Sequence, residues 1–260
     1  MSNIKLFGSD EYITFKEDTH QYFDPDKKEY QSVSRVLKKY VEPFDSKKIS
    51  LMMSGGDVKK QKKLLDEWKL KADNSVNHGN KIHASLENYS LGKMSLIEDL
   101  LLMDLAKRLF SNFSDYYRIW PEIILHSKAH LIAGQTDLGM KRQGWQGKDH
   151  IVDFYDYKTN LEQGIRYDSI GWNKTPIKHY NRYLLSPISH LEDCNYNKYA
   201  LQLSIYGYLA EITYGIKVGK LMIIFIWLKN GRYEYKFLPV PYMRLEVIAI
   251  FNDVLNLKQL

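Results

Sequence analysis

Cysteine is almost absent from this chain of 260 residues, which contains Cys194 alone. One cysteine excludes an internal disulfide framework, a cysteine-ligated zinc site and a four-cysteine iron–sulfur cluster, and it fits a reducing, intracellular setting. Long apolar runs are absent too, because the longest, residues 221–228, is far too short to cross a bilayer. The first residues contain neither the apolar stretch of a secretion signal nor an arginine-rich targeting helix. We therefore expect a soluble, cytoplasmic protein that is neither secreted nor bound to a membrane.

Acidic residues are the scarcer charge, with 31 Asp and Glu against 37 Lys and Arg, which gives a net charge of +6. Residues 35–71 contain eleven basic and five acidic residues, so this segment alone matches the excess of the whole chain. A basic face on a helical segment is typical of proteins that bind the phosphate backbone of nucleic acids. A solvated helix face is the alternative that charge alone leaves open.

The first part of the chain favours a hairpin followed by helices. Alternating residues at 12–15 and 20–23 predict an N-terminal hairpin. Capping residues predict a short helix over 32–40 and another from Asp45 to residue 53. Apolar periodicity then predicts three helices, over residues 59–72, 76–89 and 96–110.

The second part is rich in β-branched and aromatic residues. It predicts successive strands over residues 119–126, 129–133, 137–141 and 150–157, the last two joined by a turn at 142–148. Residues 160–195 are polar and show no clear period, and a loop of that length is usually functional or mobile. A helix over 196–214, a hairpin of strands 218–228 and 232–238, and a final helix from residue 242 complete the order.

This order predicts a mixed α/β fold in which helices flank a central mixed sheet, with an N-terminal hairpin and a helical extension. We divide the chain into residues 1–115, the hairpin and basic helical region, and residues 116–260, the core sheet and its helices. We expect the two parts to form one compact unit.

Asp156 and Lys158 are two residues apart on a predicted strand, so both side chains leave the same face. Taken alone, such a pair is more often a solvated cross-strand salt bridge than part of a site. Asp137 begins the preceding strand, and a hairpin would return it toward Asp156. Because two carboxylates at close range repel each other, a divalent cation is the natural partner for them.

Two further residues could join this group. His83 is one helical turn from Glu87, a spacing more often found in surface pairs than in ligand pairs. Gly79 precedes it, and a glycine there lets another backbone or a ligand approach closely. Glu122 is a carboxylate in an otherwise apolar strand, which is costly unless it meets a metal, a cation or solvent. The solvated face of an edge strand remains the alternative for Glu122.

Taken in order, these motifs resemble the PD-(D/E)XK nuclease superfamily: Gly79-x-x-x-His83, Glu122, Gly134-x-x-Asp137, Asp156-x-Lys158 and Gln202-x-x-x-Tyr206. Within it the chain is most similar to the RecB and Cas4-type exonuclease branch, which includes phage exonucleases and the mitochondrial genome maintenance exonuclease. The resemblance covers residues 79–206, and residues 32–37 look like the family's N-terminal helix signature. Two departures are that Asp156 replaces the more common glutamate and Thr136 replaces the proline. The cysteine cluster of some members is missing, so no iron–sulfur cluster is expected.

The resemblance implies a restriction-endonuclease-like core and a set of roles. His83, Asp137 and Asp156 would be metal ligands, joined by the backbone carbonyl of Tyr157, with Glu122 as a further candidate ligand. The metal would be Mg²⁺ or Mn²⁺. Lys158 would position or activate the attacking water and stabilise the charge that develops on the phosphate.

The resemblance also implies contacts with DNA. Gln202 and Tyr206 would contact the DNA strand or support the β-strand that carries the catalytic residues. Such a pair also commonly borders an apolar helix face. The lysine-rich helices would follow the backbone, and aromatic and basic residues within 160–195 suit the stacking of unpaired bases. An ordinary polar loop is the alternative for that segment. The candidate DNA contacts are Gln202, Tyr206, Lys59, Lys60, Lys62, Lys63, Trp172 and Arg182.

We therefore expect a metal-dependent DNA exonuclease that acts on single strands or duplex ends, in DNA repair, recombination or phage DNA processing. The setting would be a bacterial or phage-infected cell, with a helicase or recombination protein as a further partner. One rival is a structure-specific endonuclease or nickase on the same core. The other is a nucleic-acid binding module whose core is catalytically silent.

Overall fold

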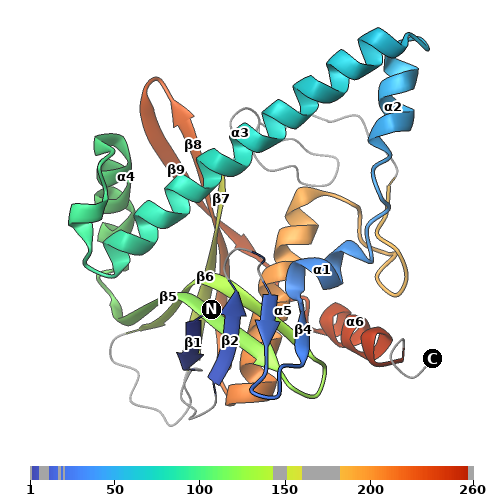
Figure 1. Cartoon of the computed structure of the whole chain (residues 1–260). Helices are drawn as coiled ribbons and strands as arrows, with labels where there is room; N and C mark the ends of the chain where they lie inside the picture. The colour runs from blue at the N-terminus through green and yellow to red at the C-terminus, as the bar shows by residue number, and fades with distance from the viewer. Residues whose placement is uncertain are drawn as a thin grey trace.

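A computed structural model of the chain describes residues 2–5, 12–16, 19, 21–142, 151–159 and 182–256. Its strands form one mixed sheet in the order β1-β2-β3-β4-β6-β7-β8-β9, and β5 pairs with β6 outside this path (Figure 1). The strands are β1 Ser2–Lys5, β2 Tyr12–Lys16, β3 Gln21–Phe23, β4 Glu29–Ser32, β5 Tyr116–Ser127, β6 Ile132–Arg142, β7 Ile151–Thr159, β8 Lys217–Lys229 and β9 Arg232–Val240.

The predicted N-terminal hairpin is confirmed as the antiparallel pair β2–β3, in which the Phe15 and Tyr22 rings stack 4.9 Å apart. β1 and β4 extend it on either side. β4 then runs parallel to the start of β6, where Gln31 lies opposite Ile132. The hairpin is thereby continuous with the central sheet.

The two strands predicted over 129–133 and 137–141 are wrong as separate elements, because residues 132–142 form the single strand β6. Its antiparallel ladder with β5 runs from Ser127 opposite Ile132 to Tyr116 opposite Arg142. Residues 134–136, which separate the two predicted strands, are paired with β5 and belong to the same strand. Leu131, with φ 51°, ends the turn that precedes the strand.

Helices cover both faces of the sheet. α1 Val33–Lys38, α5 Asn195–Tyr214 and α6 Arg244–Asn256 pack against one face, and the alternate β7 residues Val152 and Phe154 belong to that core. α3 Val58–Ser90 and α4 Leu100–Phe110 cover Tyr155 and Tyr157 on the other face. The strand period of two thus sends neighbouring residues of β7 into different cores. The predicted mixed α/β class, with flanking helices and an N-terminal hairpin, is confirmed.

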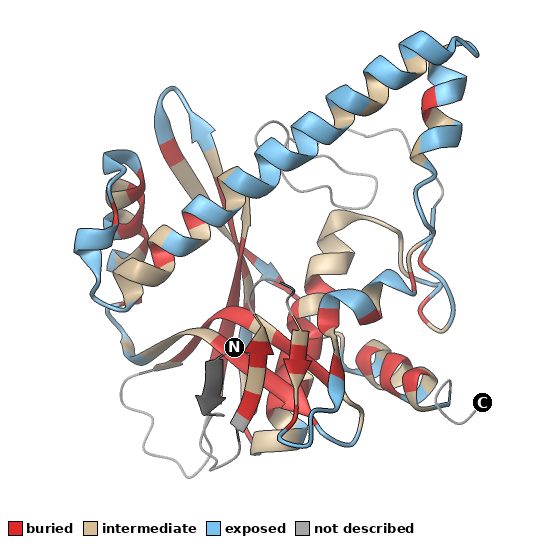
Figure 2. Ribbon diagram, in the orientation of Figure 1, coloured by how far each residue is buried: buried red, intermediate tan, exposed pale blue. Residues whose placement is uncertain are grey.

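α3 is one helix of 33 residues, so the prediction of two helices over 59–72 and 76–89 is wrong. The polar residues 73–75 include neither proline nor glycine, and exposed polar side chains do not interrupt helical hydrogen bonding. Asp57 caps its start. α2 Ser46–Met53, capped by Asp45 as predicted, lies along the first half of α3, where the Gln61 amide donates to the Lys47 carbonyl at 3.0 Å. This half of α3 projects from the sheet and is largely exposed (Figure 2).

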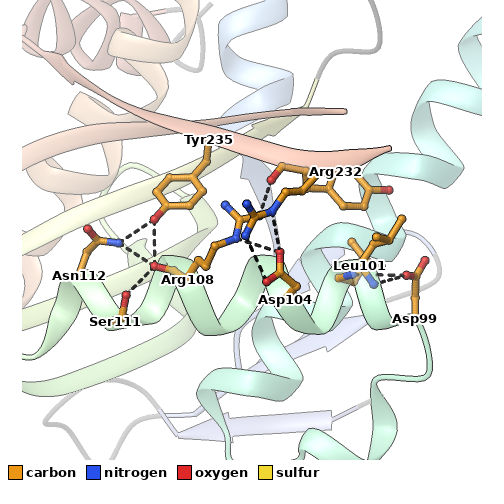
Figure 3. A network of polar contacts seen from close by, with 10 residues as sticks. Asp99, Leu101, Asp104, Arg108, Ser111, Asn112, Arg232 and Tyr235 are labelled. Carbon is orange, nitrogen blue, oxygen red and sulfur yellow. Dashed lines mark hydrogen bonds and ion pairs between the residues drawn. The ribbon is translucent and has the colours of Figure 1, made fainter. Parts of the chain in front are cut away.

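α4 begins at Leu100 rather than at residue 96, because Asp99 caps it and accepts the Leu101 N–H at 2.9 Å. A polar network joins α4 to β9 (Figure 3). In it Arg108 and Arg232 converge on Asp104 at 2.9 and 3.2 Å, and the Asn112 amide donates to the Tyr235 hydroxyl at 2.9 Å. Both arginines hold the pKa of Asp104 below its usual range.

The elements that follow agree with the sequence. α5 ends at Gly215, whose φ of 63° forms a left-handed cap, and α1 is capped by Ser32. The β8–β9 hairpin turns at Asn230 and Gly231, both with positive φ. The final helix begins at Arg244, two residues later than predicted.

The structure covers some predicted segments only in part. Residues 143–148 of the predicted turn and residues 160–181 of the predicted loop lie outside the described residues, whereas 182–194 contain neither a helix nor a named strand. Within the described ranges, no helix combines the length and apolar character of a membrane span. The division of the chain at 115/116 stays a prediction.

Candidate metal centre and active site

The site lies where β6 and β7 separate. Their described ladder runs from Met140 opposite Asp153 to Leu138 opposite Tyr155. Beyond it, side chains of β6 take over the hydrogen bonds of the backbone. The Thr136 hydroxyl donates to the Tyr155 carbonyl at 3.2 Å, and the Asp137 carboxylate accepts the N–H of Tyr157. Asp137 is therefore fixed where the gap between β6 and β7 begins.

His83 reaches Asp137 from α3, with 3.0 Å between His83 Nδ1 and Asp137 Oδ1. The helix can come this close because a Cβ at Gly79 would lie only 3.2 Å from the Thr159 hydroxyl. The His83 ring also packs edge-on against Tyr157. Burial lowers the pKa of His83, but the Asp137 and Asp156 carboxylates outweigh this and raise it to about 8. For Asp137, burial is outweighed by His83 and Lys158, so its pKa is below its usual range.

Glu122 enters the same place from β5. The ladder pairs Pro121 with Leu138 and Ile123 with Thr136, but gives no pair between Glu122 and Asp137 at the rung between them. Glu122 has a φ of 48°, a left-handed conformation that costs a side chain of this kind about 1–3 kcal/mol. Such strain is characteristic of positions where the surrounding structure holds a functional side chain in place.

One ligand atom each from His83, Glu122 and Asp137 lies within 4.8 Å of the other two. Burial, followed by the Asp137 and Glu87 carboxylates, raises the pKa of Glu122 to about 8. Two carboxylates and an imidazole at this spacing can hold a divalent cation, which would relieve the repulsion between the carboxylates. The oxygen-rich set suits Mg²⁺, and the imidazole also suits Mn²⁺.

Asp156 and Lys158 leave the same face of β7, as the strand spacing predicts, and form an ion pair. The Lys158 ammonium also lies 4.9 Å from the centre of the Tyr199 ring. Burial lowers the pKa of Lys158, but Asp156 and Asp137 outweigh burial and raise it. These carboxylates favour the charged form of Lys158, which can therefore supply positive charge at the site.

Asp156 stands apart from the three residues that converge. Its buried Oδ2 atom is the one that contacts the Lys158 ammonium, and no other hydrogen-bond donor among the described residues reaches this atom. Burial raises its pKa to about 6, against the opposing effect of Lys158. Ligation by Asp156 and by the Tyr157 carbonyl stays a prediction, because the backbone contact that Tyr157 makes with the site is through its N–H.

Gln202 and Tyr206 lie on the same face of α5, where the Gln202 amide donates to the Tyr206 hydroxyl at 2.9 Å. Tyr206 is only 4% exposed. Its ring packs against Gly134, where an added Cβ would lie 2.7 Å from Tyr206 Cε1 and 2.6 Å from Val33 Cγ2. This favours the alternative in which Tyr206 braces β6, and it explains the glycine three residues before Asp137.

The predicted DNA contacts on α3 are exposed and far from the site. Lys59, Lys60, Lys62 and Lys63 all lie on its first two turns. Lys59 is 24 residues before His83, which places it about 36 Å away along the helix axis. Arg182 is exposed, and Trp172 lies outside the described residues.

Sequence reasoning missed Tyr199. The signal was available, because Tyr199 is three residues before Gln202 and therefore lies on the same side of the predicted helix. It also did not foresee that Asp137 and Thr136 hold β7 through their side chains, since this depends on how far the two strands separate.

No protein-family model and no curated protein matches the chain. Among solved structures, a proposed exonuclease from Eubacterium rectale aligns at 12% identity and a TM-score of 0.39, over 70% of this chain and 67% of that one. The protein SSO0001 aligns at 11% identity and a TM-score of 0.31, over 88% and 76% of the two chains. Likenesses this distant assign neither a family nor an activity, so the functional argument depends on the site.

Proposed function

We propose that the chain is a Mg²⁺- or Mn²⁺-dependent deoxyribonuclease of the PD-(D/E)XK type that acts as an exonuclease. The observation that carries the proposal is the convergence of His83, Glu122 and Asp137 beside the paired Asp156 and Lys158, at the opening between two strands. Strain at Glu122 and the burial of the Asp137 and Asp156 carboxylates make a purely structural salt-bridge cluster a costly arrangement.

His83, Glu122 and Asp137 would hold the ion, and Asp156 could join them by turning away from Lys158. When bound, the ion would polarise a phosphate oxygen and supply positive charge to the reacting group. Asp137 is suited to a fixed position because the Tyr157 N–H and the His83 ring both hold its carboxylate.

Lys158 would stabilise the negative charge that develops on the phosphate during attack by water. Its ammonium is partly buried, with 20% of the side chain exposed, and a charge in such surroundings acts more strongly than one in water. In the metal-free protein the neighbouring Asp156 and Asp137 carboxylates raise the pKa of Lys158 and favour its charged form, which suits an electrostatic role.

The substrate would be single-stranded DNA or a duplex end. Exposed lysines on the first turns of α3 would neutralise phosphates of a strand that extends away from the site. Such an enzyme would serve DNA repair, recombination or phage DNA processing, alongside a helicase or recombination protein.

The test uses single strands, duplexes and covalently closed circles, the linear substrates labelled at their 5′ or 3′ ends, with Mg²⁺, Mn²⁺ or EDTA. The proposal expects metal-dependent release of nucleotides from ends, lost in Lys158→Ala while DNA binding is retained. Lys217→Ala, a change at an exposed lysine of β8, is the control and should cut at the wild-type rate.

Three results would overturn parts of the proposal. Cleavage of closed circles would favour the endonuclease. Tight DNA binding without cleavage in either metal would favour the silent binding module. Wild-type cleavage by Lys158→Ala would show that the site is elsewhere.

A further inference from the structure

Tyr199 lies near the start of α5, and its ring covers the Lys158 ammonium at 4.9 Å from ring centre to Nζ. The Asp156 carboxylate contacts the same ammonium. Both groups, the Tyr199 ring and the Asp156 carboxylate, contact the lysine head. Tyr199 is partly buried and packs against the core under α5, so the helix fixes the position of its ring.

The two contacts differ in whether they would persist when a cation binds at the site. Asp156 is a carboxylate close to Asp137 and His83, and it could leave Lys158 to bind a cation. The face of the Tyr199 ring attracts a cation through its quadrupole and cannot accept the proton of an ammonium. When Asp156 turns toward an ion, the ring is the contact that remains.

We propose that Tyr199 is a positioning residue that holds the Lys158 ammonium toward the reacting phosphate, above all when Asp156 turns to the metal. The inference rests on the proposed function, because it assigns a role in the same reaction. A lysine side chain has four rotatable bonds, and without the ring its head would spread over several positions in the opening.

Tyr199→Leu removes the ring and keeps an apolar side chain, whereas Tyr199→Phe keeps the ring and removes the hydroxyl. We expect Tyr199→Leu to lower kcat by roughly tenfold with little change in KM, and Tyr199→Phe to restore kcat to near the wild-type value. Tyr208→Leu is the matched control, because Tyr208 is on the same helix and its ring contacts Arg244 at 5.6 Å, away from the site. It should retain the wild-type kcat.

A second readout needs neither metal nor activity. In EDTA, the rate at which an amine reagent acylates Lys158, measured by mass spectrometry, should rise in Tyr199→Leu and stay near the wild-type rate in Tyr199→Phe. Unchanged labelling in Tyr199→Leu, or an unchanged kcat, would overturn the inference.

If Tyr199→Leu fails to fold, a series of increasingly fluorinated phenylalanines at position 199 keeps the ring size and weakens only its negative face. The inference expects kcat to fall steadily along this series, and a flat series would overturn it. Lys158→Ala separates the two proposals. If that variant is inactive while every Tyr199 variant is as fast as the wild type, the role of Tyr199 alone is wrong. If Lys158→Ala is itself active, the proposed function is wrong.

Discussion

Glu122 of β5 lies opposite Asp137 of β6, at a rung where the ladder between these strands gives no pair. The φ of 48° at Glu122 accompanies this interruption, and one ligand atom of each carboxylate lies within 4.8 Å of the other and of His83. Backbone conformation and charge both oppose this arrangement in the metal-free protein, so the arrangement itself has consequences that can be measured.

Glu122→Gly should make the metal-free protein more stable and inactive. Glycine relieves the left-handed strain and removes a carboxylate, and after its own entropic cost we expect a gain of about 1 kcal/mol. Urea unfolding in EDTA measures this. Lys27→Gly, at a surface turn with φ 63°, is the control and should add stability without loss of activity. A Glu122→Gly protein that is less stable than the wild type would contradict the argument.

Removal of divalent metal should destabilise the protein. If a site formed by His83, Glu122 and Asp137 binds Mn²⁺, then metal at a hundred times its Kd adds about 2.7 kcal/mol of stability, which appears as a higher Tm. Asp137→Asn should abolish most of this gain, whereas Asp66→Asn, an exposed change on α3, should preserve it. Equal shifts in all three proteins would place the metal elsewhere.

In EDTA, stability should fall as the pH rises from about 5 to about 8. The pKa of Glu122 is raised from 4.5 to about 8, so its ionisation is less favourable in the folded protein and stability is lost across this window. His83 acts in the same direction, because its pKa is raised from 6.5 to about 8 and its contribution is lost as it deprotonates. Urea unfolding at several pH values measures the slope. Glu122→Gln should flatten the slope and Glu98→Gln, at an exposed residue, should not; a stability that increases over this range would refute the prediction.

Gly134→Ala should destabilise the protein by about 1–3 kcal/mol, the usual cost of overpacking a core. Its Cβ would meet Val33 Cγ2 at 2.6 Å and the Tyr206 ring at 2.7 Å, and both neighbours are buried. Gly79→Ala should cost less, because the atom it meets, at 3.2 Å, is a single hydroxyl. Thermal unfolding of the two variants compares them, and a larger loss in Gly79→Ala would argue against close packing at Gly134.

Features that depend on local sequence could be predicted. Ser32, Asp45 and Gly215 mark helix ends because capping involves only neighbouring residues, and the Asn230-Gly231 turn follows from its own backbone preferences. The shared face of Asp156 and Lys158 follows from the period of a strand.

Features that depend on distant contacts could not. β6 is continuous through its polar residues because β5 pairs along its length, and no local signal reports that pairing. The conformation of Glu122 and the pairing of Asp156 with Lys158 rather than with the ligand group are set by several elements at once. Burial decides the place of Tyr206, and the sequence shows only its spacing from Gln202.

The bond between the Asp137 carboxylate and the Tyr157 N–H gives one side chain two tasks. The Asp137 side chain keeps β6 and β7 apart beyond the end of their ladder, and it presents a ligand atom in the gap between them. The position of the ligand atom and the separation of β6 and β7 therefore cannot change independently of each other. Glutamate at 137 would lengthen the side chain and keep its charge, whereas asparagine would keep its length and remove the charge. Comparing the two variants therefore separates the shape of the gap from the charge within it.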